Sequence, residues 1–178
     1  MISTKDITKE ILKKEPKIKV LFKKSFPPAE RLPISLLLRR VKNAGAKFVA
    51  YYEDNDFIGI SYSIPAGNKK TYILYIAVVD EARGKGYGTI IINRIKEQCI
   101  GDTIFLSIDE ISEKYDDYEL RKKRQVFYEK NGFILNDFTT KDFGMVFNIM
   151  SYNGLITKSD FDELVDRLAG KVLKIFYK

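Results

Sequence analysis

A glycine-rich segment flanked by basic residues is the part of this sequence that most clearly indicates chemistry. It reads Arg83-Gly84-Lys85-Gly86-Tyr87-Gly88-Thr89, after a strongly apolar run and before a stretch with helical periodicity. Glycines have no Cβ, so phosphates can approach the main chain closely. A helix N-terminus adds partial positive charge at the same place. The segment predicts a site for a phosphorylated ligand; a glycine-rich turn with solvated basic residues is the alternative.

Two common phosphate-binding motifs do not fit the spacing of this segment. A Walker A loop needs four residues between its first glycine and a Gly-Lys-Ser/Thr string, which the sequence lacks. A Rossmann fingerprint needs GxGxxG, whereas the third glycine here comes one residue too early. What remains is R-x-x-G-x-G between a buried strand and an amphipathic helix, which would present several backbone N–H groups to a pyrophosphate.

Hydrophobic periodicity predicts the elements around the segment. Helices are expected at 18–25, from Pro33 to about residue 43, at 91–99 and at 119–130, and one more helix is expected in the tail, capped by Ser159 with Asp162. Strands are expected at 47–52, 57–64, 71–79, 103–108, 133–138, 144–152 and 172–177. This order indicates a mixed α/β sheet with helices on both faces.

Composition removes several kinds of catalysis. The chain has 178 residues, no histidine and one cysteine, Cys99. Ser-His-Asp and Cys-His catalysis and histidine-ligated zinc are therefore excluded, and no disulfide can form within the chain. Cys99 ends an apolar helical stripe and is predicted to be a buried structural thiol. Proton transfer must use tyrosine, carboxylates, lysine, water or the backbone.

A second segment supplies a resemblance to a known family. Phe127-Tyr128-Glu129-Lys130-Asn131-Gly132-Phe133 is an aromatic-rich helix end that runs into Gly-Phe. With Val78-Val79-Asp80-Glu81-Ala82 and the glycine segment, it resembles the two signatures of the GNAT superfamily of N-acetyltransferases, over roughly residues 46–152. The resemblance implies a GNAT-like, largely antiparallel sheet flanked by helices, splayed between the strand before the glycine-rich loop and the next strand.

The resemblance assigns the acetyl-CoA site residue by residue. Pantetheine would pair with the main chain of Ile76, Ala77 and Val78, and a backbone N–H near Val78 would stabilise the oxyanion. Arg83, Gly84, Lys85, Gly86, Tyr87, Gly88 and Thr89 would hold the pyrophosphate. Many relatives have asparagine where this chain has Arg121, which shares a helical face with Arg124 and Tyr128. Both arginines are hypothesised to contact CoA phosphates or an acidic part of the acceptor; a solvated charge run is the alternative.

The same resemblance suggests the proton-transfer groups. Tyr128 matches a tyrosine that protonates the leaving thiolate, and packing as a core aromatic beside Phe127 and Phe133 is the alternative. Asp109 at the end of a strand is the preferred general base. Glu110 or water could take that role. The alternative to a catalytic role is that Asp109 is simply an exposed acid at the end of a strand. The loop around Phe26-Pro27-Pro28-Ala29-Glu30-Arg31 would shape the acceptor pocket, unless Phe26 simply anchors it on the core.

These observations lead to a functional hypothesis for a single domain spanning residues 1–178. The chain is expected to transfer acetyl from acetyl-CoA to a primary amine by direct attack in a ternary complex, without a metal. Small-molecule acceptors are preferred to proteins, and a different acyl donor remains open. A non-catalytic acyl-CoA-binding or regulatory module is the alternative from another class. The expected location is cytoplasmic, because no apolar run has the length of a membrane span.

Net charge narrows the partners only in part. The chain carries a net charge of +7, which favours anionic ligands. Nucleic acid is not expected, because no recognisable module with stacking aromatics is present, and no membrane partner is expected either. A homodimer is allowed.

Overall fold

The computed structural model describes residues 1–142 and 144–173 and divides into two compact units. The first unit contains Met1–Pro65 and Ile73–Gln98, and the second contains Ala66–Tyr72 and Cys99–Lys178. Each unit is described by itself. The expectation of one domain over the whole chain stays a prediction.

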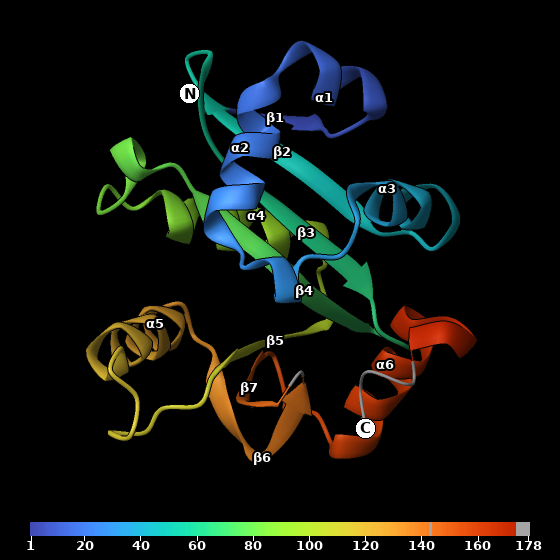
Figure 1. Ribbon diagram of the computed structural model, residues 1–178, viewed down its shortest axis with the longest axis vertical. Helices are drawn as coiled ribbons and strands as arrows, with labels where there is room; N and C mark the ends of the chain where they lie inside the picture. The colour runs from blue at the N-terminus through green and yellow to red at the C-terminus, as the bar shows by residue number, and fades with distance from the viewer. Residues whose placement is uncertain (143, 174–178) are drawn as a thin grey trace. The chain divides into compact units, whose positions relative to one another are not determined.

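The first unit is built on strands in the order β1-β2-β3-β4 (Figure 1). These are β1 (Ile2–Asp6), β2 (Lys47–Glu53), β3 (Asp56–Pro65) and β4 (Lys70–Val78), whose first residues belong to the second unit. β1 pairs antiparallel with β2, and β2 pairs antiparallel with β3. The β2–β3 turn places Asp54 and Asn55 at φ 47° and 84°, a conformation typical of tight hairpins. The predicted hairpin is therefore confirmed.

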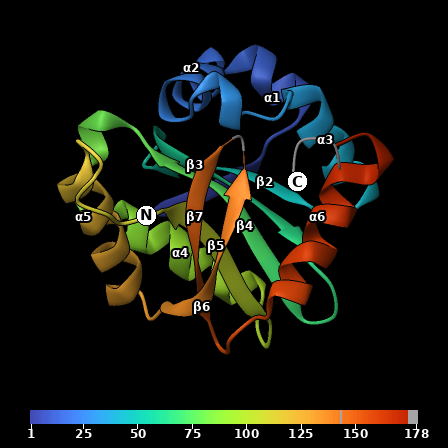
Figure 2. The same cartoon turned by 60° about the horizontal axis from the view of Figure 1, so that its bottom comes forward.

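Helices cover both faces of these strands. α1 (Lys9–Lys14), α2 (Pro16–Ser25) and α3 (Ile34–Asn43) lie on one side, and α4 (Tyr87–Gln98) lies on the other (Figure 2). Tyr62 of β3 donates a hydrogen bond to the carbonyl oxygen of Leu37 in α3 at 3.2 Å. Gly59, three residues earlier and so on the opposite face, lies against Ile91 of α4. The predicted two-sided coverage is confirmed for this unit.

Gly59 allows a close approach of β3, β4 and α4. A Cβ added there would lie 2.4 Å from the carbonyl oxygen of Ala77 and 3.1 Å from Cδ1 of Ile91. Because the nearest atom belongs to the backbone, the strand itself would have to shift. We expect Gly59→Ala to lower the free energy of unfolding by about 1–3 kcal/mol, measured by urea titration. Gly45→Ala cannot serve as a control for crowding, because φ at Gly45 is +67° and an alanine there would strain the backbone. Unchanged stability in Gly59→Ala would contradict the prediction.

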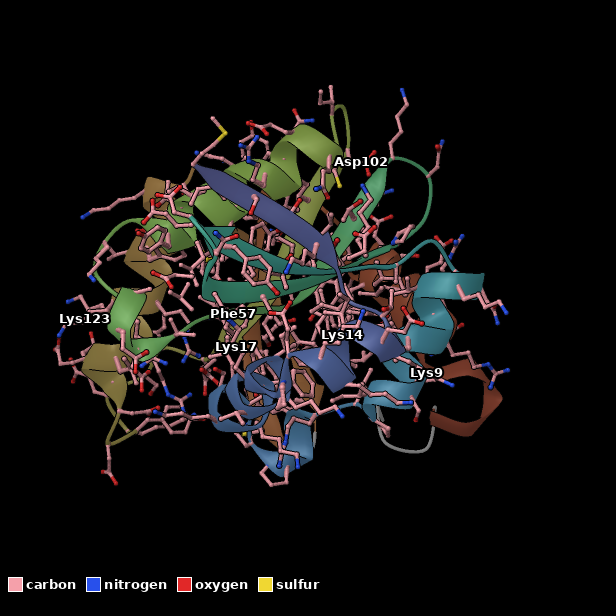
Figure 3. All side chains as sticks on the ribbon, turned by 90° about the horizontal axis from the view of Figure 1, so that it is seen from above. Lys9, Lys14, Lys17, Phe57, Asp102 and Lys123 are labelled. Atoms are coloured by element: carbon pink, nitrogen blue, oxygen red, sulfur yellow. The ribbon has the colours of Figure 1, made fainter. Side chains whose placement is uncertain are left out.

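α1 and α2 are amphipathic, with lysines on the outside. Ile18, Leu21 and Phe22 of α2 are buried, whereas Lys9, Lys14 and Lys17 are exposed (Figure 3). Lys17 nevertheless stays close to the protein, with Nζ 5.3 Å from the centroid of the Phe57 ring. This arrangement lets the stem of a lysine cover apolar surface while its charge remains in water.

The second unit holds the strands β5-β7-β6 in that order. β5 (Thr103–Asp109) and β6 (Ile134–Asp142) both pair antiparallel with β7 (Met145–Tyr152). α5 (Tyr118–Lys130) packs on β5, and α6 (Lys158–Leu173) follows β7. With the first unit, the described residues form seven strands. The predicted mixed α/β fold with largely antiparallel strands and flanking helices is thus confirmed, while the splay stays a prediction.

Three local expectations need correction. The cap of α6 is a reciprocal pair two residues earlier than predicted: the Asp160 N–H donates to Thr157 Oγ1 at 3.2 Å, and the Thr157 N–H donates to Asp160 Oδ2 at 2.9 Å. The predicted strand 172–177 begins inside α6, and residues 174–178 lie outside the described residues. Cys99 is half-buried rather than buried, because it follows the last turn of α4.

Candidate functional site

The glycine-rich loop forms an open turn between β4 and α4. After β4 comes a short 3-10 turn, Asp80–Ala82, and then Gly84 and Gly86 adopt φ values of +75° and +85°. Glycine is favoured in this left-handed region because a Cβ would be strained. A Cβ built on either glycine would meet no atom within 4 Å. The main chain at both positions is therefore open to an incoming ligand.

The same loop ends in the N-terminus of α4. The first hydrogen bond of this helix runs from the Ile90 N–H to the Gly86 carbonyl oxygen at 3.2 Å. The N–H groups of Tyr87, Gly88 and Thr89 come before that bond, so helix geometry gives them no acceptor within α4. Such groups, together with the helix dipole, bind anions such as phosphate. The loop thus fits a pyrophosphate by backbone geometry as well as by composition.

Two side chains of the loop, those of Arg83 and Tyr87, are paired with neighbouring acidic residues. Arg83 Nη2 lies 3.0 Å from Asp80 Oδ1, and Asp80 also forms an ion pair with Lys24 of α2. The Tyr87 hydroxyl donates to Glu53 at the end of β2, and this hydrogen bond and burial raise the pKa of Tyr87. Tyr87 is thereby turned toward Glu53, while Lys85 and Thr89 are exposed.

The segment of β4 predicted to pair with pantetheine precedes this loop. Ala77 is buried, and Ile76 and Val78 are half-buried. The Val79 N–H donates to the carbonyl oxygen of Ile58 at 3.0 Å, so it is already used within the first unit. The assignment of the oxyanion contact to an N–H near Val78 stays a prediction.

Tyr128 lies in an aromatic cluster at the C-terminal end of α5. Its ring centroid is 5.1 Å from that of Phe127 and 5.7 Å from that of Phe133, and Phe133 lies 5.8 Å from Tyr152. Burial raises the pKa of Tyr128 to about 12, and the positive charge of Arg124 acts in the opposite direction. The phenol is consequently protonated at neutral pH, as a proton donor must be.

The two candidate bases at the end of β5 both have partners. Asp109 forms an ion pair with Arg124 of α5. Glu110 Oε2 accepts from the Tyr115 hydroxyl at 2.9 Å and lies 2.7 Å from Lys114 Nζ. The hydrogen bonds from Lys114 and Tyr115 hold the pKa of Glu110 below its usual value. Of the two carboxylates, that of Asp109 is the one paired with a side chain of α5, the helix that carries Tyr128.

The guanidinium group of Arg121 already contacts other residues of the second unit. Nε donates to Asp117 Oδ1 at 2.6 Å, Nη1 donates to the Glu110 carbonyl oxygen at 3.0 Å, and the guanidinium carbon lies 3.9 Å above the Tyr115 ring. The side chain is only 15% exposed. These contacts hold the connection between β5 and α5 in place. Binding of CoA by Arg121 would require some of them to be exchanged, so that role stays a prediction.

The structure gathers the predicted residues into two groups. The loop residues and the end of β4 lie in the first unit, whereas Asp109, Arg121, Arg124 and Tyr128 lie in the second. Arg124 forms an ion pair with Asp109, and its charge also acts on Tyr128 of the same helix. The shared helical face predicted the second relation and not the first. Three residues that hold predicted site residues in place were missed: Asp80, Tyr115 and Asp117. Two of them had a sequence signal, because Asp80 and Asp117 lie three and four residues before the arginines with which they pair.

Two further properties concern the described part of the chain. Among the residues that the structure places, no cluster of three or more histidine, cysteine, aspartate or glutamate side chains has an arrangement that could hold a metal ion. None of the helices there combines the length and the apolar character needed to cross a membrane.

Comparison with known proteins identifies the family. The model of the acetyltransferase (GNAT) domain matches residues 44–135, which is more than half of the chain and includes the glycine-rich loop and the Tyr128 segment. No curated protein matches the sequence.

Solved structures show the same fold at low sequence identity. A protein of the GNAT acetyltransferase family from Bacteroides thetaiotaomicron has a TM-score of 0.75 and 21% identity, with 96% of this chain and 98% of that chain covered. An aminoglycoside 6'-N-acetyltransferase complexed with coenzyme A has a TM-score of 0.65 and 18% identity, covering 84% and 95%. A spermidine N-acetyltransferase that is a chimera of SpeG from Vibrio cholerae and hSSAT has a TM-score of 0.64 and 14% identity, covering 84% and 95%.

The open glycine turn at the start of α4, the fold and the match over residues 44–135 all lead to one assignment. This chain belongs to the GNAT family and is an acetyl-CoA-dependent acetyltransferase.

Proposed function

We propose that this protein transfers acetyl from acetyl-CoA to the primary amine of a small molecule, by direct attack in a ternary complex. The observation that carries the proposal is the loop at Gly84 and Gly86, where the main chain is open and leads into the N-terminus of α4. Some proteins of the same fold are named as acetyltransferases for aminoglycosides and spermidine, which supports a small amine as acceptor.

The described residues can supply the proton transfers that this reaction needs. The amine nitrogen attacks the thioester carbon, the carbon–sulfur bond breaks, and CoA leaves as the thiolate. Tyr128 donates a proton or a hydrogen bond to that sulfur, and Asp109 accepts the proton of the amine directly or through water. The backbone N–H groups of residues 87–89, with Arg83 and Lys85, hold the pyrophosphate. In this scheme the ion pair with Arg124 holds the carboxylate of Asp109 in place.

Replacing Asp109 tests the assignment of the base. We expect Asp109→Asn to lower kcat by about 10²-fold at neutral pH, because the amide cannot accept the proton of an ammonium. Glu110→Gln is the matched control: it alters the neighbouring carboxylate, whose partners are Lys114 and Tyr115, and should change kcat little. Steady-state kinetics at saturating acetyl-CoA measures both. If Glu110→Gln has the larger effect, the base is misassigned.

A panel of acceptors tests the overall proposal. Spermidine, kanamycin, free amino acids and a lysine-containing peptide would each be incubated with acetyl-CoA, and release of the free thiol would be followed. Turnover with spermidine or kanamycin that exceeds turnover with the peptide supports a small-molecule acceptor. Turnover only with the peptide would overturn that part of the proposal, and hydrolysis of acetyl-CoA alone would not support it.

A further inference from the structure

We propose that Tyr75 is a positioning residue for the amine acceptor, because it holds the connection between α2 and α3 against the strand that leads to the acetyl-CoA site. The connection comprises residues 26–33 and includes a short 3-10 turn, Pro28–Glu30. The inference rests on the proposed function and adds to it the residue that fixes the acceptor side of the site. All the residues concerned belong to the first unit.

The hydroxyl of Tyr75 makes two hydrogen bonds to the connection. It donates to the carbonyl oxygen of Glu30 at 2.7 Å and accepts from the N–H of Leu32 at 2.9 Å. Tyr75 is only 3% exposed, so these bonds compete little with water and are strengthened by the low local dielectric. One hydroxyl thus fixes two backbone groups that are two residues apart.

Aromatic packing holds the ring of Tyr75 in the orientation that these bonds require. Its centroid lies 4.6 Å from that of Phe26, 5.1 Å from that of Phe22 and 6.2 Å from that of Tyr62. Phe26 is the first residue of the connection, so Tyr75 contacts both of its ends. Phe26 therefore does anchor the loop on the core, as the structural reading of the sequence predicted.

A second anchor lies just beyond the segment assigned to the donor. Lys24, the residue before the last one of α2, forms an ion pair with Asp80, which begins the 3-10 turn after β4. The chain from Lys24 to Leu32 is thus attached to Asp80 at one end and to Tyr75 at the other. Residues 76–79 lie between those two attachment points. The connection consequently runs beside the donor segment, where an amine has to approach the thioester.

Loss of the hydroxyl should disturb the acceptor more than the donor. The proposed donor contacts use the main chain of Ile76, Ala77 and Val78 and the glycine-rich loop, which Tyr75→Phe leaves intact. The connection, in contrast, loses two hydrogen bonds near its C-terminal end while the ring packing remains. Because a less ordered connection must be ordered when the amine binds, which costs affinity, we expect KM for the amine to rise by about tenfold or more.

The test compares Tyr75→Phe with Tyr51→Phe in the full chain. Tyr51 is also a buried tyrosine of the first unit, and its hydroxyl shares a hydrogen bond with Ser61 at 2.9 Å. Both variants lose one buried hydroxyl, but only Tyr75→Phe affects the connection. For each variant, KM and kcat are measured with spermidine and with kanamycin as the acceptor. The Kd of CoA and the hydrogen-exchange rate of the Leu32 amide are measured as well.

We expect a higher KM for the amine and faster exchange of the Leu32 amide in Tyr75→Phe alone. The kcat and the Kd of CoA of that variant should stay within about twofold of wild type. An equal change of amine KM in both variants, or unchanged Leu32 exchange, would overturn it. The proposed function would fail differently, because the wild-type protein itself would then acetylate no amine.

Discussion

Replacing Tyr128 with phenylalanine is expected to lower kcat for acetyl transfer by about 10²-fold or more and to leave the Kd of CoA unchanged. The phenyl ring keeps the aromatic packing with Phe127 and Phe133 but has no proton for the departing sulfur. Parallel measurements of thiol release and of CoA binding separate the two effects. A non-catalytic acyl-CoA-binding protein would show no turnover to lose.

The pKa of Tyr128 limits how it can act. A thiol with a pKa near 8.5 is a stronger acid than a phenol whose pKa burial has raised to about 12. Complete transfer of the proton from the phenol to the thiolate is therefore uphill, so in the proposed mechanism we expect Tyr128 to act mainly by hydrogen bonding to the sulfur as charge develops. The form that this role requires is the protonated one, which persists at every pH well below 12. The kcat profile should accordingly show no decline caused by Tyr128 between pH 7 and 10.

Tyr152→Phe is the control for a packing role. Tyr152 belongs to the same aromatic cluster, with its ring 5.8 Å from that of Phe133, so both substitutions remove one hydroxyl from the same group of rings. If the two variants lost activity to a similar degree, Tyr128 would be a core aromatic and not the proton donor.

Elements with a strong periodic pattern were predictable from the sequence. α4 buries Ile91, Ile92 and Ile95 at helical spacing, and the β2–β3 hairpin has alternating strands around a turn rich in Asp and Asn. The glycine-rich loop was predictable for a related reason, since glycine is strongly favoured at the positive φ values of residues 84 and 86. In these places the structure requires a particular type of residue at a particular position, so the requirement can be recognised in the sequence.

Elements held by backbone bonds or by distant partners were not predictable. β1 is an edge strand in which only Ile2 is partly buried, and its pairing with β2 uses main-chain groups that carry no residue signature. α1 has six residues and one buried side chain, Leu12. In the candidate site, the pairing of Asp109 with Arg124 joins residues 15 positions apart. Tyr75 and Glu30 are separated by 45 positions, and no local pattern connects them.

The second large effect is expected for a substitution in the glycine-rich loop. We expect Gly86→Val to weaken CoA binding by about 10²-fold, because the loss of one or two charge-assisted hydrogen bonds to phosphate costs about 3 kcal/mol. The valine side chain would occupy space that is open within 4 Å of the Cβ position. It would also strain a backbone with φ of +85°. Titration calorimetry with CoA measures the affinity, and thermal unfolding measures the strain.

Gly101→Val separates these two consequences. Gly101 lies in the turn between α4 and β5, has φ of +86°, and likewise has no atom within 4 Å of a built Cβ. The same substitution therefore imposes a similar backbone strain, of about 1–2 kcal/mol, outside the donor loop. We expect both variants to lose similar thermal stability and only Gly86→Val to lose CoA affinity. Equal CoA affinity in the two variants would mean that the open space at Gly86 is not where phosphate binds, and the donor site would have to be sought outside this loop.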